Sequence, residues 1–204
     1  RRRLAVDLHQ GLARVGVGGP FGAFVGQDQK QSDTYIVSVN QAGPGMPDRD
    51  YYLKDDEQFV KGRELFRAYV QKLFELAGIE GGADKAKALY DLEHALAEVH
   101  WTKEDNRDPV KGYNPHTPEQ LAELAPKINW QITLDAAQIQ GRDRYIVQQP
   151  SYFAGASEII ANTPVETWKD YLTFQTMDAF APVLSDVFFK AWFEFYQAGL
   201  QGIE

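Results

Sequence analysis

The residues of this chain that could hold a hydrolytic metal ion are its histidines and carboxylates, so their spacing is the first question. A zinc peptidase site on one helix requires His-Glu-x-x-His, because two imidazoles reach one ion from a helix only when they lie four residues apart. The histidines are His9, His94, His100 and His116, and none of them forms that pair. We therefore expect no metal to be bound by this chain.

A helical carboxylate–histidine metal enzyme is an alternative interpretation of the same residues. His94 and Glu98 lie at i, i+4 and could supply two ligands, to which Glu93 and His100 would have to be added. The spacing of these four residues scatters them around a helix, and two ligands alone make a weak site. An exposed polar pair of His94 and Glu98 is the favoured interpretation.

Signatures of nucleophilic and nucleotide-dependent chemistry are also missing from the sequence. There is no Gly-x-Ser-x-Gly elbow and no Walker motif, and the absence of cysteine excludes a thiol nucleophile and disulfides. The stretch GVGGPFG carries Gly16 and Gly18, but Phe21 stands where a dinucleotide fingerprint needs its third glycine. No residue set in the chain therefore supports catalysis by itself, and no catalytic residue is predicted.

Two short motifs instead combine arginine and aspartate with proline and tyrosine. They are PGMPDRDYYL, residues 44–53, and NRDPVKGYNP, residues 106–115. Their singled-out residues are Pro47, Asp48, Arg49, Asp50, Tyr51 and Tyr52 in the first motif, and Arg107, Asp108, Pro109, Tyr113 and Asn114 in the second. An arginine can fork onto a carboxylate or onto loop carbonyls, a tyrosine buries its ring while its hydroxyl bonds, and proline fixes the backbone.

These motifs are predicted to be stiff corners that set the angles between helices. The alternative, substrate contact by the arginines, is less favoured because a loop arginine beside an aspartate is usually satisfied internally. In the first motif we expect Arg49 to be the internal clamp, at the exit from a small sheet into the first long helix. The substitution Arg49→Ala should then lower the melting temperature and leave any ligand affinity nearly unchanged.

The elements that position these motifs are mostly helical, and the predicted fold is a mainly α, multi-helix domain with a small two- or three-stranded β element. Apolar residues recur at helical spacing over 57–77 and over 89–99, and helix starts with capping boxes are expected at Thr117 and Thr163. Strands are expected at residues 35–40 and 145–149, while 16–33 has the glycines of a loop. Leu4 to about Val15 is predicted to be a further helix, and no linker divides the chain.

The last predicted helix, DVFFKAWFEFYQAGLQ, has an unusually wide apolar arc. Its polar residues fall on one narrow stripe and its remaining circumference is aromatic or aliphatic. One neighbouring helix cannot cover so wide an arc. Either this helix crosses the middle of its own bundle, or it packs against something that is not in the chain.

Length and charge limit the class of protein further. The 204 residues with 44% hydrophobic and 25% charged side chains suit a globular protein with a real core. The formal net charge of -8 argues against a nucleic-acid partner, which needs a basic surface. No apolar run approaches the ~18 residues of a membrane helix, and the start Arg1-Arg2-Arg3 suggests the edge of a processed or excised piece.

The two motifs and their surroundings resemble the amino-terminal part of the neprilysin-like (endothelin-converting-enzyme family) zinc metallopeptidases. The similarity runs from about Leu8 to Gly202 and includes MPDRDYYL, HWTKEDNRDPVKGYNP, INW, VQQPSYF and TWKDYL, in that order. The closing FFKAWFEFYQAGLQG is similar to the segment that leads toward the catalytic half in this family. Gly112 departs from the Thr-Tyr-Asn that the family often has at that corner.

The resemblance implies that residues 1–204 are the cover domain of an extracytoplasmic zinc endopeptidase whose catalytic zinc domain is absent. Zinc would belong to the parent enzyme only, and this chain would wall the cavity and be inactive alone. Its implied partners are the missing catalytic domain of the same polypeptide and peptide substrates. In its lack of cysteine the chain resembles a bacterial member of the family. The parent protein is then expected to be periplasmic or lipid-anchored at the cell envelope. A stand-alone helical binding or interaction protein without peptidase activity is the alternative.

Overall fold

The computed structural model describes residues 16–203, and within it the chain divides into two compact units. Unit 1 comprises the residues up to Gly43 together with Val99–Thr163, and unit 2 comprises Pro44–Glu98 together with the residues from Pro164 onward. Each unit is thus built from two separate stretches of chain. At one boundary the chain passes from unit 2 to unit 1 between Glu98 and Val99, within the regular helix α4 (Gly82–Val99). A helix has no linker composition, and this is why the sequence did not predict the division. The helix predicted before Gly16 lies outside the described residues.

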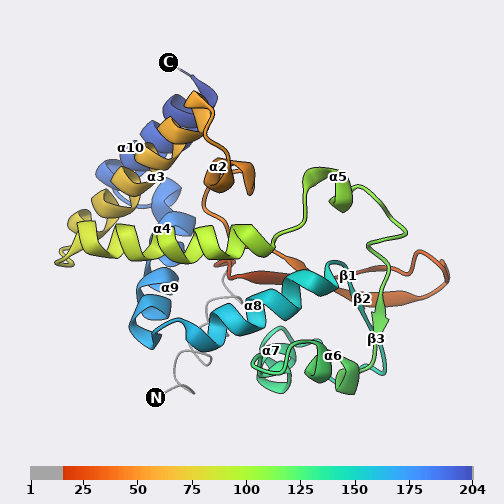
Figure 1. Cartoon of the computed structure of the whole chain (residues 1–204). Coiled ribbons are helices and arrows are strands. Elements are labelled where there is room, and N and C mark those ends of the chain that lie inside the picture. Colours follow the sequence, from red (N-terminus) through yellow and green to blue (C-terminus); the bar gives the residue numbers. More distant parts are fainter. Residues whose placement is uncertain (1–15, 204) are drawn as a thin grey trace. The chain divides into compact units, whose positions relative to one another are not determined.

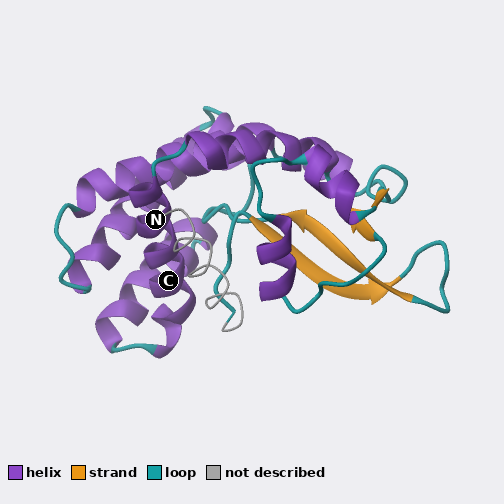
Figure 2. Cartoon of the chain, turned by 90° about the horizontal axis from the view of Figure 1, so that it is seen from below, coloured by secondary structure: helices purple, strands orange, loops and turns teal. Residues whose placement is uncertain are grey.

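Unit 1 contains a four-stranded sheet in the order β1-β2-β4-β3 (Figure 2). Its strands are β1 (Phe21–Gln27), β2 (Tyr35–Gln41), β3 (Pro115–His116) and β4 (Tyr145–Val147). The strand β2 pairs antiparallel with β1 and parallel with β4, and β3 pairs antiparallel with β4. The two strands predicted from the sequence are therefore neighbours in the sheet. The mainly α fold with a small β element is confirmed, with four strands rather than two or three.

The loop predicted over residues 16–33 is wrong where β1 forms. Two glycines and the lack of apolar–polar alternation hide this strand in the sequence. Its consecutive residues Phe24 and Val25 are 48% and 58% exposed, so side chains on both faces of the strand reach solvent. The strand exists because its backbone pairs with β2 along its whole length, from Phe21 opposite Gln41 to Gln27 opposite Tyr35.

The helices of unit 1 are α5 (Lys103–Asn106), α6 (Pro118–Leu124), α7 (Trp130–Ala136) and α8 (Pro150–Asn162). Figure 1 shows α6 and α7 side by side, and β1, α7 and α8 each supply one ring to an aromatic core. The rings of Phe21, Trp130 and Phe153 lie within 5.6 to 6.2 Å of one another. The capping box predicted at Thr117 is confirmed, because its hydroxyl accepts from the Gln120 amide and the Gln120 side chain accepts from the Thr117 amide.

All the regular secondary structure in the described part of unit 2 is helical. Its elements are α2 (Asp50–Leu53), α3 (Glu57–Leu76), α4 up to Glu98, α9 (Val165–Phe180), the 3₁₀ turn η1 (Ala181–Val183), α10 (Asp186–Phe193) and the π-helical η2 (Glu194–Leu200). In Figure 1, α3 lies beside α10. The fully buried ring of Phe66 in α3 contacts Phe174 of α9 and Phe195 of η2, at 5.8 and 5.9 Å between centroids. These contacts join the helices into one core.

The capping box predicted at Thr163 does not form. Thr163 is the residue at which α8 ends, and its hydroxyl donates to the carbonyl of Ile159 at 2.7 Å. Pro164 is the residue before α9, and no side chain caps this helix. The Thr-Pro pair therefore ends one helix, because the same hydroxyl that could cap the next helix can bond back to the preceding turn.

The last predicted helix is two elements, α10 and the π-helical η2, and its apolar arc is only partly covered. Ala191 and Phe195 are buried in unit 2. Val187 and Phe189 of α10 remain 51% and 43% exposed. The helix thus buries one side on its own bundle and leaves apolar side chains in solvent on the other. No described helix is both long enough and apolar enough to cross a membrane.

Candidate functional site

The first motif, residues 44–53, forms a turn at Asp48 that leads into the short helix α2 (Asp50–Leu53). The Asp48 carboxylate accepts from the Asp50 amide at 2.7 Å, and the Asp48 carbonyl accepts from the Tyr51 amide at 3.3 Å. The carboxylate of Asp50 in turn pairs with Lys54, 2.8 Å from its Nζ. An aspartate that bonds to the backbone two residues on is a typical turn former. The acidic residues of the motif are thus used to build the corner.

The clamp that the structure shows at this corner is Arg63 of α3. Its Nη1 donates to the carbonyls of Lys54 and Tyr51, at 2.6 and 3.2 Å, and its Nη2 pairs with Asp55 at 3.0 Å. The side chain of Arg63 is only 12% exposed. Sequence inspection missed this residue because it lies in a regular helix outside the motif. Arg49, the predicted clamp, is the residue that precedes α2, and its role as a clamp stays a prediction.

The Tyr51 ring explains why a glycine follows within α3. A Cβ added at Gly62 would lie 2.8 Å from Cδ1 of Tyr51, closer than real side chains approach. The ring of Tyr51 also contacts Phe59 edge-on, with centroids 5.0 Å apart. Tyr51 therefore packs closely against the first turns of α3, which confines the corner sterically.

Tyr52 connects the same corner to a buried carboxyl group. Its hydroxyl donates to Oε2 of Glu93 in α4 and accepts from the Met46 amide at 3.1 Å. The Gly45 amide donates to the same Oε2 at 3.0 Å. Glu93 is fully buried, and this burial raises its pKa to about 8. Burial and the neighbouring Glu93 raise the pKa of Tyr52 as well.

A second carboxyl group of unit 2, that of Asp178 in α9, is also bonded to tyrosines. Its Oδ1 accepts from the Tyr69 hydroxyl at 2.8 Å, and its Oδ2 lies 3.2 Å from the Tyr196 hydroxyl. The Tyr196 hydroxyl lies equally close to the Gly45 carbonyl oxygen. Burial raises the pKa of Asp178 and of both tyrosines. Sequence spacing gave no signal for this group, because its members come from distant segments.

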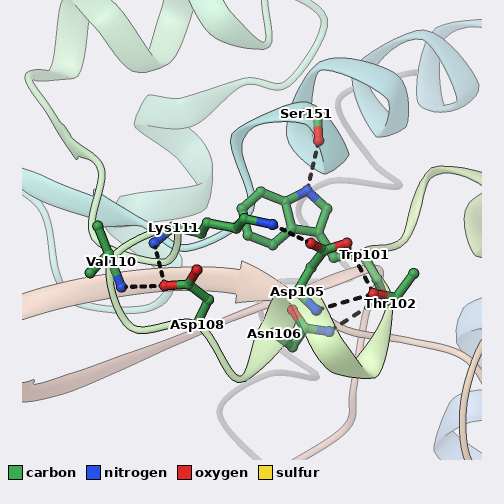
Figure 3. Close-up of polar contacts among 8 residues, drawn as sticks. All are labelled: Trp101, Thr102, Asp105, Asn106, Asp108, Val110, Lys111 and Ser151. Atoms are coloured by element: carbon green, nitrogen blue, oxygen red, sulfur yellow. Dashed lines mark hydrogen bonds and ion pairs between the residues drawn. The ribbon is translucent and has the colours of Figure 1, made fainter.

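The second motif is held by Asp108 within it and by Asp105 just before it (Figure 3). Oδ1 of Asp108 accepts from the amides of Val110 and Lys111, at 2.9 and 3.1 Å. The Lys111 ammonium reaches Oδ1 of Asp105 at 2.7 Å, and the other oxygen of Asp105 accepts from the Thr102 hydroxyl at 2.9 Å. This motif is therefore a sequence of turns closed by short local bonds.

Trp101, just before this motif, fixes it to the rest of unit 1. Its indole N–H donates to the Ser151 hydroxyl of α8 at 2.7 Å, as Figure 3 shows, and its amide donates to the Gln41 side chain of β2 at 2.8 Å. The Gln149 side chain links the same places, since it accepts from the Gln41 amide and donates to Asn106, each at 3.0 Å. Two glutamines thus join the motif to the sheet.

The carboxylate of Asp28 accepts a hydrogen bond from Tyr113, the tyrosine of the second motif. Its carboxylate is buried and accepts from the Tyr113 hydroxyl at 2.9 Å, the Lys30 amide at 2.8 Å and the Arg144 guanidinium at 3.0 Å. The bond from the Lys30 backbone, followed by the Tyr113 hydroxyl, lowers the pKa of Asp28 against the opposing effect of burial. The Lys30 ammonium lies 4.4 Å from the centre of the Tyr113 ring. Asp28 is a structural anion, and its position in a polar loop gave no sign of it.

Asn114 carries the end of the motif into the sheet. Its side-chain amide donates to the Val147 carbonyl at 3.0 Å, and its own carbonyl accepts from the Val147 amide at 2.8 Å. Arg107, by contrast, is exposed, and its backbone N–H donates to the Glu104 carbonyl at 3.2 Å at the end of α5. The fork proposed for Arg107 stays a prediction, while Oδ1 of the adjacent Asp108 accepts from backbone amides.

The remaining candidate ligands do not assemble. His94 and Glu98 form an exposed pair with 3.9 Å between Nδ1 and Oε1. His100 is buried edge-on against Tyr152, 4.6 Å between ring centres. Within residues 16–203 no three histidine, aspartate or glutamate side chains converge as a metal would require. A surface groove of about 730 Å³ in unit 1 is lined by residues that include His116 and Arg142, and it presents no nucleophile–base pair.

Comparison with known proteins gives a consistent family. The model of the amino-terminal region of peptidase family M13 matches residues 4–204. Endothelin-converting enzyme-like 1 of Mus musculus is 27% identical over 179 residues, which are 85% of this chain and 23% of that protein. Endothelin-converting enzyme 1 of Mus musculus is 30% identical over 153 residues, 70% of this chain and 19% of that protein.

Solved structures show the same likeness. The zinc metalloprotease Zmp1 of Mycobacterium tuberculosis in its open state superposes with a TM-score of 0.92 and 31% identity, covering 100% of this chain and 32% of that one. Its complex with an inhibitor gives a TM-score of 0.89. PepO of Lactobacillus rhamnosis, with a TM-score of 0.76 and 13% identity, shares the fold. The chain thus spans about a quarter of the curated relatives and about a third of these structures.

Proposed function

Because the chain belongs to peptidase family M13, we propose that it is the non-catalytic cover domain of a zinc-dependent metalloendopeptidase that hydrolyses peptides. The observation that carries this proposal is that the amino-terminal family model matches residues 4–204, while the chain covers only 32% of the Zmp1 structure. The larger part of that relative has no counterpart in this chain. The resemblance of the sequence to the amino-terminal part of the endothelin-converting-enzyme family is confirmed by the same comparisons.

The side chains in the described part of the chain do not fit a zinc ion. A catalytic zinc needs three protein ligands and an open position for water. His94 and Glu98 are the pair that comes nearest to this requirement, and they are exposed, 3.9 Å apart and without a third ligand. In the proposed enzyme the zinc and the residues that activate water therefore belong to the remaining polypeptide.

The proposed task of this chain is to wall the substrate cavity and so to limit the size of the peptides that reach the zinc. Its two stiff corners support that task, since a wall has to keep its shape. Arg63 closes the first corner through carbonyls, and Asp28 closes the second through Tyr113. The partners in this proposal are the catalytic domain of the same polypeptide and the peptide substrates.

The proposed location is outside the cytoplasm, in a bacterial periplasm or lipid-anchored at the cell envelope. The absence of cysteine and the 31% identity to a mycobacterial zinc metalloprotease support a bacterial parent. Cell fractionation of a strain that expresses the tagged parent protein tests this point, and recovery with cytoplasmic markers contradicts it.

The activity is tested by metal analysis and peptide hydrolysis, run in parallel on the 204-residue chain and on the longer product of the same gene. We expect no stoichiometric zinc and no hydrolysis with the chain alone, and both with the longer product. The size limit is tested with the longer product, which should cleave a short peptide and spare the same peptide within a folded protein. Stoichiometric zinc with hydrolysis in the 204-residue chain would overturn the proposal.

A stand-alone binding protein is the second candidate, and the exposed apolar side chains near the end of the chain favour it. Val183 and Val187 are 78% and 51% exposed, as expected of a surface that another molecule covers. The coding region after Glu204 separates the two candidates. A stop codon there supports the binding protein, and an open frame with His-Glu-x-x-His supports the peptidase.

A further inference from the structure

Unit 2 contains two acidic side chains that face tyrosines and no cation. Glu93 is fully buried and Asp178 is half-buried. Among the described residues neither forms an ion pair, and their hydrogen-bond donors are the hydroxyls of Tyr52, Tyr69 and Tyr196 and the Gly45 amide. A buried carboxylate normally needs a positive partner, because the loss of hydration is costly. The protonation states of Glu93 and Asp178 therefore affect the stability of unit 2.

The two oxygens of Glu93 are not equivalent. Oε2 accepts from both Tyr52 and Gly45, whereas Oε1 is buried without a hydrogen-bond partner in the described part of the chain. An unpaired oxygen that carries negative charge costs far more than an unpaired neutral group. This asymmetry favours a proton on Oε1, in agreement with the raised pKa of about 8.

The Gly45 peptide links the two carboxyl groups. Its N–H donates to Glu93, and its carbonyl oxygen lies 3.2 Å from the Tyr196 hydroxyl, which also lies 3.2 Å from Asp178. Tyr196 belongs to η2, a π-helical segment, and the ring of its neighbour Phe195 stacks on Tyr69 with 4.8 Å between centres. π-helical turns are rare and frequently occur at functional positions. The same small network thus holds α4, α9 and η2.

We propose that Gly45, Tyr52, Tyr69, Glu93, Asp178 and Tyr196 form a proton-controlled latch, which holds η2 against unit 2 and loosens when Glu93 loses its proton. An ionised Glu93 leaves a charged oxygen unpaired beside Asp178, a group of the same sign. The ionisation would displace the Gly45 peptide, which donates to Glu93. Because the Gly45 carbonyl oxygen contacts the Tyr196 hydroxyl, Tyr196 would be displaced with it. This proposal concerns unit 2 alone and holds whether or not a peptidase domain follows.

The other titratable groups around the latch do not neutralise it. Tyr171 of α9 raises the pKa of Tyr52 together with Glu93, and Tyr90 of α4 stacks on Tyr52 with 6.0 Å between centres. Two arginines of α3 have other partners: Arg67 lies 5.0 Å above the Tyr90 ring, and Arg63 donates to backbone carbonyls and to Asp55. Neither guanidinium contacts either carboxyl group of the latch.

The direction of the pH effect follows from the difference between the folded and unfolded states. Glu93 has an ordinary pKa of 4.5 and a folded pKa of about 8, so the folded state binds a proton that the unfolded state has released between these values. The stabilisation is complete below pH 4.5 and is lost as pH rises through about 8. Asp178, whose pKa is also raised, contributes with the same sign.

Hydrogen exchange of the 204-residue chain tests the latch, measured at roughly pH 6 and roughly pH 9 and corrected for intrinsic exchange. We expect the protection factors of the η2 amides to be at least about tenfold lower at the higher pH. A tenfold change is the effect expected when the pKa of Glu93 differs by one unit between the closed and the opened state. The α8 amides of unit 1 should keep their protection. Glu93→Gln should abolish the change, and Glu98→Gln, the same substitution at an exposed position of α4, should preserve it.

Infrared spectroscopy supplies a second readout that does not depend on exchange. The band of a protonated carboxyl group should disappear with a midpoint near pH 8 and be absent in Glu93→Gln. If Glu93→Gln does not fold, Tyr196→Phe replaces it, which should keep the infrared band and remove the pH dependence of η2. Unchanged η2 protection in the wild-type chain, or full pH dependence in either variant, overturns the proposal.

Discussion

The Tyr52 hydroxyl of α2 donates to Oε2 of Glu93 in α4, 41 residues further along the chain. This bond gives the aromatic pair of PGMPDRDYYL two separate tasks. Tyr51 packs its ring against Gly62, while Tyr52 carries a polar bond into the core. The motif is thus a corner that is fixed sterically on one side and by hydrogen bonds on the other.

Removal of the Tyr52 hydroxyl should destabilise the protein. Tyr52→Phe leaves the Met46 amide without its acceptor and takes one of two donors from Glu93. A buried polar group left unpaired costs about 1–3 kcal/mol, and urea denaturation should show a loss in that range. Tyr35→Phe is the matched control, because this ring is 82% exposed. Equal effects of the two substitutions would contradict the role assigned to Tyr52.

Arg63 should matter more for stability than Arg107. Arg63→Ala removes the donor to the Tyr51 and Lys54 carbonyls and is expected to cost about 1–3 kcal/mol. Arg63→Lys should restore only part of this, since an ammonium cannot reproduce the guanidinium fork. Arg107→Ala, at an exposed side chain, should stay within about 0.5 kcal/mol of the parent. Thermal unfolding compares the three, and a larger effect at Arg107 would refute the clamp.

Asp28 should stabilise unit 1 in a pH-dependent manner of the opposite sign to Glu93. Its folded pKa lies below the ordinary 3.8, chiefly through the Lys30 amide, so its contribution is present above pH 3.8 and is lost as pH falls through the folded value. Asp28→Asn should lower the denaturation midpoint at neutral pH, and the difference should shrink in acid. Asp33→Asn, exposed in the same loop, is the control. A constant difference at all pH values would exclude an ionic role for Asp28.

Two glycines should respond to alanine in opposite directions. At Gly155 of α8 an added Cβ would lie 2.6 Å from Cγ1 of Val99. Gly155→Ala should therefore lower the free energy of unfolding by about 1–3 kcal/mol through overpacking. At Gly112 the nearest atom is the Asp108 carbonyl oxygen at 3.5 Å, so Gly112→Ala should be neutral or stabilise by about 0.4–1 kcal/mol. Val99→Ala should partly rescue Gly155→Ala. Urea denaturation of the four variants tests this, and the absence of rescue would identify a different cause.

Features that depend on neighbouring residues were predictable from the sequence. The helix predicted over 57–77 is observed as Glu57–Leu76, and the capping box at Thr117 forms as expected. The family resemblance was also visible, since it rests on motifs in a fixed order. The prediction from local pattern was wrong at Thr163, because its hydroxyl could either cap the next helix or bond back to the preceding one. It was also wrong at β1, because this strand is formed by backbone pairing with β2 and has no alternation of buried and exposed side chains.

The sequence by itself determined the long helix at 57–76, the end of the helix at 89–99, two of the strands and the family, because each is encoded by residues close together or in a fixed order. The tertiary structure alone decided that Glu93 meets Tyr52, that Asp178 meets Tyr69 across 109 residues, and that Arg63 of α3 reaches the Lys54 carbonyl. Spacing along a chain carries no information on which distant side chains share a core. Burial and the pairing of polar atoms make that selection only once the helices have packed.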